Sequence, residues 1–73
     1  MLIDLMSFRS AVRRVLLIHI NRQDYRATVN ALLIISSRHP DPDRLLIMEN
    51  VVKQLLPNNP EVLDRWHKLM MLS

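Results

Sequence analysis

The chain has 73 residues, of which 49% are hydrophobic and 23% charged, and its net charge is +3. This composition excludes an intrinsically disordered chain, and the length allows a single domain over residues 1–73. Cysteine is absent, which excludes disulfides and thiolate metal sites, and the absence of glycine argues against the tight turns of a β-rich fold.

The apolar residues are not arranged as a membrane span or a secretion signal. The longest uncharged stretch, residues 27–37, is about half as long as a bilayer crossing requires. Asp4, Arg9, Arg13 and Arg14 interrupt any apolar segment of a signal peptide. We therefore expect a cytoplasmic protein without a membrane span.

A first helix is expected from Leu2 to Ile20, because apolar side chains recur there at helical spacing. One face of this helix carries Leu5, Phe8, Val12, Val15, Leu16 and His19. A second face carries Leu2, Met6, Leu17 and Ile20, with Arg9 and Arg13 one turn apart in its middle. A helix that is apolar on two sides is usually sandwiched between neighbours, or between its own domain and a partner.

A second helix is expected from Arg22 to Arg38, with Asn21 as its N-cap and Asp24 three residues later in a variant of the capping box. Its core face carries Tyr25, Val29, Leu32 and Ile35. A narrower stripe of mostly small residues carries Ala27, Ala31 and Ile34, and small side chains there would let another helix approach closely.

Two prolines mark the starts of the last two helices. Asp41 is expected as an N-cap with Pro42 at the first helical position, and Asn59 with Pro60 repeats this arrangement. The apolar faces carry Leu45, Met48, Val51, Val52, Leu55 and Leu56 in the third helix, and Val62, Trp66, Leu69 and Met70 in the fourth. The pattern predicts an all-α fold, a four-helix array of antiparallel helical hairpins that is either tetratricopeptide-like or an orthogonal bundle.

The segment from Lys53 to Trp66, KQLLPNNPEVLDRW, resembles the junction between two tetratricopeptide repeats. The earlier stretch NRQDYRATVNALLIISSRHPD is similar in outline, with Tyr25, Leu32 and Pro40 matching the aromatic, the packing residue and the terminal proline of a repeat's second helix. The resemblance implies stacked antiparallel helix pairs that bind a peptide or a helix, without catalysis. Because three repeats are normally needed to close such a core, two repeats would expose an apolar face.

The residues that could carry chemistry do not form a recognisable active site. His19, His39 and His67 are too far apart in sequence for two of them to share one helix at metal-ligand spacing. The carboxylates mostly lie at expected helix starts, where capping explains them, and no glycine-rich loop is present to hold a phosphate. We expect no enzyme activity, no metal, no cofactor and no small-molecule substrate.

The first helix has more apolar residues than one buried face requires, and surplus apolar surface usually marks an interface. We predict a protein–protein interaction module, such as a small helical adaptor, chaperone or inhibitor, that acts as a homodimer or heterodimer. The expected partner-binding residues are Leu2, Met6, Arg9, Arg13, Leu17, Ile20, Met70 and Met71. Arg9 and Arg13 would orient an acidic partner.

The alternative prediction is a small basic regulator that binds nucleic acid. Residues 1–26 carry five arginines against two aspartates, whereas residues 27–73 carry five basic and five acidic residues. The excess could form a basic surface from Arg9, Arg13, Arg14, Arg22 and Arg26. The two apolar faces of the first helix leave little room for a helix that enters a nucleic-acid groove, which favours the protein partner.

Overall fold

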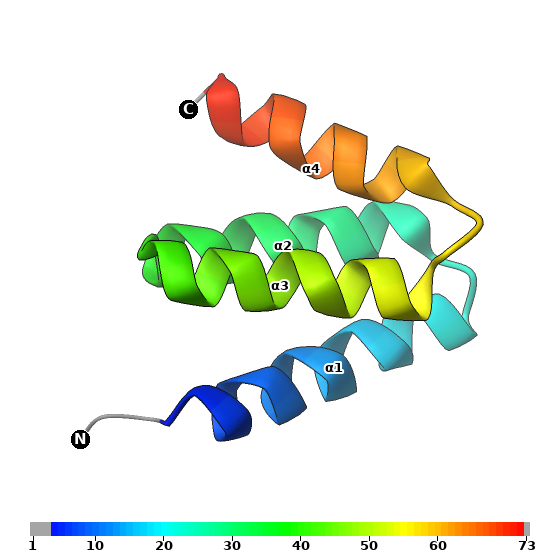
Figure 1. The fold of residues 1–73 in the computed structure, drawn as a ribbon. Helices are drawn as coiled ribbons and strands as arrows, with labels where there is room; N and C mark the ends of the chain where they lie inside the picture. Colours follow the sequence, from blue (N-terminus) through cyan, green and yellow to red (C-terminus); the bar gives the residue numbers. More distant parts are fainter. Residues whose placement is uncertain (1–3, 73) are drawn as a thin grey trace.

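The computed structural model describes residues 4–72, which form four α-helices joined by short turns (Figure 1). The helices are α1 (Leu5–Asn21), α2 (Tyr25–Arg38), α3 (Pro42–Leu55) and α4 (Pro60–Met71). No strand occurs within the described range. The predicted all-α class is therefore confirmed, and so is the number of helices.

The chain runs back and forth, so that consecutive helices are antiparallel and alternate helices run in the same direction (Figure 1). Within residues 4–72, α1 contacts α2 and α3, α4 contacts the same two helices, and α1 does not contact α4. The α2–α3 turn lies at the same end as the start of α1 and the end of α4 (Figure 1). Each of the two outer helices therefore keeps a long side that no other described helix covers.

The proline-marked helix starts are confirmed. The backbone N–H of Arg44 donates to the Asp41 carboxylate at 3.1 Å, and Pro42 occupies the first turn of α3. The backbone N–H of Glu61 likewise donates to Asn59 Oδ1 at 3.3 Å at the start of α4. At both positions proline has no backbone N–H to leave unsatisfied, so the local chemistry alone sets the start of the helix.

The expected N-cap Asn21 is wrong, because Asn21 is the last residue of α1. Instead, Asp24 caps α2, and its carboxylate accepts the backbone N–H of Ala27 at 3.0 Å. The turn between the helices is a Schellman motif, in which the N–H groups of Gln23 and Asp24 donate to the carbonyls of Ile20 and His19. Gln23 has a φ of 56°, so it takes the left-handed conformation that glycine usually supplies in this turn.

The first helix begins at Leu5 rather than at Leu2, and Leu2 lies outside the described residues. Asp4 is the N-cap, and its carboxylate accepts the backbone N–H of Ser7 at 2.8 Å and the Ser7 hydroxyl at 2.9 Å. These two hydrogen bonds hold the pKa of Asp4 below its usual value, because both favour the charged form. Helix α1 therefore begins at Leu5, the residue directly after its N-cap Asp4.

All four helices contribute to one hydrophobic core. Its buried apolar residues are Phe8, Val12, Leu16, Val29, Leu32, Met48, Val51, Val52, Val62 and Trp66. Four residues expected on the core faces are instead partly exposed, namely Leu5, Val15, Tyr25 and Leu69. Leu5 and Tyr25 are the first residues of α1 and α2, so the ends of the bundle leave them uncovered. Val15 and Leu69 lie at the edges of their stripes, where a helix with neighbours on only some of its sides cannot cover its whole apolar arc.

The end of the bundle that holds the α2–α3 turn is closed by contacts around Phe8. The Phe8 ring meets the His39 ring edge-on at a centroid distance of 5.1 Å. The guanidinium of Arg44 lies 5.6 Å from the centre of the same ring. These contacts fix the start of α1 against the turn and set the register of the antiparallel α1–α2 hairpin.

Candidate functional site

The residues expected to bind a partner occupy different environments in the structure. Met6 and Met71 are more than 80% exposed, and Arg13 is exposed as well. Ile20 and Met70 pack against the core of their own chain, and Leu17 is half-buried. The Arg9 guanidinium donates to Gln54 Oε1 at 2.8 Å, which ties α1 to α3.

The structure does not bring these residues together on one surface. Met6, Arg9 and Arg13 belong to α1, whereas Met70 and Met71 belong to α4, and the two helices do not contact each other in the described range. The sequence predicted exposed apolar groups at both places, but the distance between them depends on how the hairpins stack.

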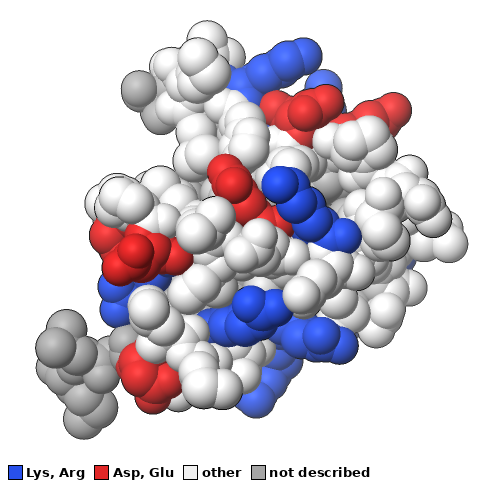
Figure 2. All heavy atoms as spheres, in the orientation of Figure 1, with Lys and Arg blue, Asp and Glu red and all other residues white. Residues whose placement is uncertain are grey.

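The expected basic surface is also divided. Figure 2 shows basic side chains gathered where α1 meets α3, with acidic side chains nearby on the same face. Arg9 and Arg13 lie on α1, Arg22 follows its last residue, and Arg26 lines a groove beside α4. The five arginines therefore do not form one continuous stripe along a helix.

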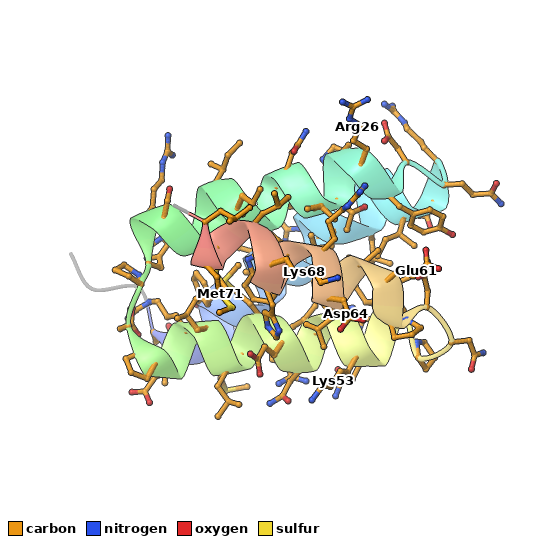
Figure 3. The ribbon with its side chains drawn as sticks, turned by 90° about the horizontal axis from the view of Figure 1, so that it is seen from above. Arg26, Lys53, Glu61, Asp64, Lys68 and Met71 are labelled. Atoms are coloured by element: carbon orange, nitrogen blue, oxygen red, sulfur yellow. The ribbon has the colours of Figure 1, made fainter. Side chains whose placement is uncertain are left out.

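A groove of about 780 Å³ lies between the first turns of α2 and the length of α4. Its apolar lining consists of Tyr25, Val29, Val62, Leu69 and Leu72. Its charged lining consists of Arg26, Glu61, Asp64, Arg65 and Lys68, and Figure 3 shows Glu61, Asp64 and Lys68 along the outward side of α4. Three basic and two acidic side chains surround the same space, so the groove does not select a partner of one charge.

Sequence reasoning did not find this groove. The apolar patterns place Tyr25 and Leu69 on core faces, but both are partly exposed and line the groove. The spacing of Glu61, Arg65, Lys68 and Leu72 does place them along one side of a helix. The position of α2 beside that side is a tertiary feature, and no local pattern in the chain indicates it.

A second surface is the outer side of the α1–α2 hairpin. One flank of α1 faces α3, where Arg9 contacts Gln54, and one flank of α2 faces α4, where Ser36 accepts a hydrogen bond from Trp66. The remaining flanks of the two helices are not covered by α3 or α4. By helical periodicity these flanks carry Ala11, Arg14, Val15, Ile18 and Arg22 from α1 and its C-cap, and Ala27, Ala31, Ile34 and Arg38 from α2. We call this surface the α1–α2 face.

The centre of the α1–α2 face is apolar and open to solvent. Ile18 is 51% exposed and Ile34 is 56% exposed, although both are large aliphatic side chains. Ala27 and Ala31 are half-buried between the two helices, and Val15 is 37% exposed. Ala27 and Ala31 have small side chains, which allow another helix to approach closely, and Ile18 and Ile34 are exposed on the two helices of the same hairpin.

The rim of the α1–α2 face has more basic than acidic side chains. Arg14, Arg22 and Arg38 are exposed, and none of them pairs with a carboxylate among residues 4–72. The acidic residues of the hairpin are Asp4 and Asp24, which by the same periodicity lie on these flanks at the two ends of the face, where each accepts a hydrogen bond from the first turn of its own helix. The α1–α2 face therefore combines an apolar centre with three arginines and two capping aspartates, a net positive rim.

The described residues show neither of two other kinds of site. No group of three or more His, Asp or Glu side chains in residues 4–72 is placed to hold a metal ion. None of the four helices is long and apolar enough to cross a bilayer. Comparisons with protein-family models, with curated proteins and with solved structures find no match to this chain.

Proposed function

We propose that this chain is a protein-interaction module that binds another protein through the α1–α2 face, in the manner of a small helical adaptor, chaperone or inhibitor. The observation that carries the proposal is the exposure of Ile18 on α1 and Ile34 on α2, on a face that also carries the small residues Ala27 and Ala31. Apolar residues that gather on one side of a small domain are typical of an interface, whereas single exposed ones are common everywhere.

One exposed apolar residue of α3 lies outside this face. Leu46 on α3 is 57% exposed, as much as Ile34, but its neighbours Asp43 and Asn50 on the same side of the helix are polar. Leu46 therefore provides a matched control, because it has the same exposure as Ile34 and a similar side chain but lies outside the α1–α2 face.

The proposal is tested with the variants Ile18→Asp, Ile34→Asp and Leu46→Asp. Each chain is used as bait in an extract of the organism that encodes it, and captured proteins are quantified by mass spectrometry. We expect wild type and Leu46→Asp to retain the same partner and both isoleucine variants to lose it, because a buried unpaired carboxylate is costly at an interface. Equal retention by all four chains would contradict the proposal.

The partner is either a different protein or a second copy of this chain, and sedimentation velocity on the purified protein distinguishes the two. A dimer that dissociates in Ile18→Asp but persists in Leu46→Asp would identify the second copy. Circular dichroism on each variant confirms that the helices are intact, which is expected because all three positions face solvent.

A further inference from the structure

We infer that the α1–α2 face binds an amphipathic helix whose apolar stripe is flanked by Asp and Glu, supplied by a different protein. This inference rests on the proposed function, because it names the chemistry of the partner at the same face. It is carried by charge complementarity between the rim of the face and the flanks of such a helix.

The charge of the two hairpins differs sharply. Residues 4–38 carry six arginines against two aspartates, whereas residues 41–72 carry four basic and five acidic residues. Of the six arginines, Arg14, Arg22 and Arg38 surround the apolar centre of the α1–α2 face and form no ion pair with a carboxylate of residues 4–72, while Asp4 and Asp24 at its ends accept hydrogen bonds from their own helices. A partner with acidic flanks would supply the missing counter-charges while its apolar residues cover Ile18 and Ile34.

The same charges argue against a second copy as the occupant. Two copies joined by a twofold axis would place the same face on both sides of the interface. Arg14, Arg22 and Arg38 of one copy would then lie close to those of the other, and like charges brought together at an interface oppose binding. The basic rim thus selects a partner of opposite charge over self-association.

The shape of the face favours a helix as the bound element. The exposed centre follows two antiparallel helices, with Ala27 and Ala31 one turn apart on α2 and Val15 and Ile18 about one turn apart on α1. A partner helix lying along this strip would insert side chains at positions i, i+3 or i+4, and i+7, as helices do when they bind in apolar grooves. Binding of an extended peptide by strand addition is excluded for residues 4–72, because they contain no strand.

The test uses two synthetic peptides of one design, each an amphipathic helix with leucines along one stripe and alanines opposite. The first carries Glu along both flanks of the stripe and the second carries Lys at the same positions. Binding of each labelled peptide to the full chain is measured by fluorescence anisotropy at low and at high salt. We expect the Glu peptide to bind at least about tenfold more tightly at low salt, with the difference shrinking as salt screens the charges.

Variants of the chain then assign the binding to the face. The triple variant Arg14→Glu, Arg22→Glu and Arg38→Glu should reverse the preference, so that the Lys peptide binds better. The triple variant Lys53→Glu, Arg65→Glu and Lys68→Glu serves as the matched control, because it changes the net charge by the same amount at three exposed cations of α3 and α4, and it should leave the preference unchanged. Ile18→Asp should weaken binding of the Glu peptide, because the apolar centre supplies contact area that charge alone does not replace.

The outcomes separate this inference from the proposed function. If both peptides bind equally and Ile18→Asp weakens both, the face binds helices without selecting charge, and the acidic partner is wrong while the interaction function stands. If neither peptide binds while Ile18→Asp still loses its cellular partner, the acidic helix is wrong as the ligand and the interaction function stands. A DNA duplex that binds more tightly than the Glu peptide and is unaffected by Ile18→Asp would overturn the inference in favour of a nucleic-acid ligand.

Discussion

Trp66 Nε1 donates a hydrogen bond to Ser36 Oγ over 3.3 Å, and this bond joins α4 to α2 inside the core. Trp66 is fully buried, so its indole N–H has no access to water and depends on the serine hydroxyl. The Ser36 hydroxyl in turn donates to the carbonyl of Leu33 at 3.1 Å, which orients its oxygen toward the indole. One small polar residue thus satisfies the polar atom of the largest side chain in the core.

Ser36→Ala should therefore lower the free energy of unfolding by about 1–2 kcal/mol, because the buried indole N–H loses its acceptor. Ser37→Ala is the matched control, since the Ser37 hydroxyl bonds only to the carbonyl of Ile34 within its own helix and is exposed. Urea denaturation of both variants should show a change of no more than about 0.5 kcal/mol for Ser37→Ala. Equal losses of unfolding free energy in the two variants would show that the hydrogen bond from Trp66 to Ser36 does not contribute to stability.

Gln23→Gly should raise the stability of the protein. Gln23 has a positive φ in the Schellman turn after α1, and a residue with a Cβ adopts that conformation at a cost of about 1 kcal/mol relative to glycine. The gain is measured by thermal or urea denaturation. Asn30→Gly, at an exposed position inside α2, should lower stability because glycine is unfavourable in the middle of a helix. A loss of stability in Gln23→Gly would mean that the glutamine side chain makes a compensating contribution.

The starts of α2, α3 and α4 show what could be predicted from the sequence and what could not. Pro42 and Pro60 fixed two helix starts correctly, because proline restricts its own φ and lacks an N–H regardless of tertiary structure. Asn21 and Asp24 are both good caps, and the choice between them depended on Gln23 accepting a positive φ. No local preference of glutamine indicates that conformation, so the sequence alone favoured the wrong cap.

The candidate site was harder to predict than the helices, for a physical reason. Helix α1 has apolar residues on more than one side, and the sequence does not say which sides α2 and α3 will cover. Ile20, expected to face a partner, packs against the core, while Val15, expected in the core, is partly exposed. The stripe of Ala27, Ala31 and Ile34 was identified as a place where a helix could approach closely, but its juxtaposition with Ile18 required the hairpin geometry.

Acid should destabilise the protein through its helix caps. The pKa of Asp4 is lowered by hydrogen bonds from Ser7. Partial burial acts to raise the pKa of Asp41, but the Arg44 backbone N–H, its guanidinium hydrogen bond and its charge together lower it. A carboxyl whose pKa is lower in the folded state stabilises that state once it is ionised, so this contribution is present at neutral pH and disappears as pH falls below about 4.

The measurement is urea denaturation at several pH values for wild type and for the double variant Asp4→Asn and Asp41→Asn. Asparagine keeps an oxygen that can cap the helix but does not titrate, so the double variant should lose less stability between neutral and acidic pH than wild type does. At neutral pH it should be somewhat less stable, because it lacks the charge at the two helix N-termini. Identical pH dependence in both chains would show that other carboxyls control acid unfolding.

Alanine substitutions at Leu32 and Ile34 test whether one side of α2 belongs to the core and the other to the interface. Leu32 is fully buried and Ile34 is 56% exposed, although they are two residues apart in α2. Leu32→Ala should cost about 2–5 kcal/mol, since it removes buried methyl groups and leaves a cavity, and a loss of that size approaches the whole stability expected of so small a domain. Ile34→Ala should change stability by less than about 1 kcal/mol, because most of the side chain already contacts water. If Ile34→Ala instead destabilised the isolated chain as strongly as Leu32→Ala, Ile34 would belong to the core, and the α1–α2 face would lose one of the two isoleucines on which its role depends.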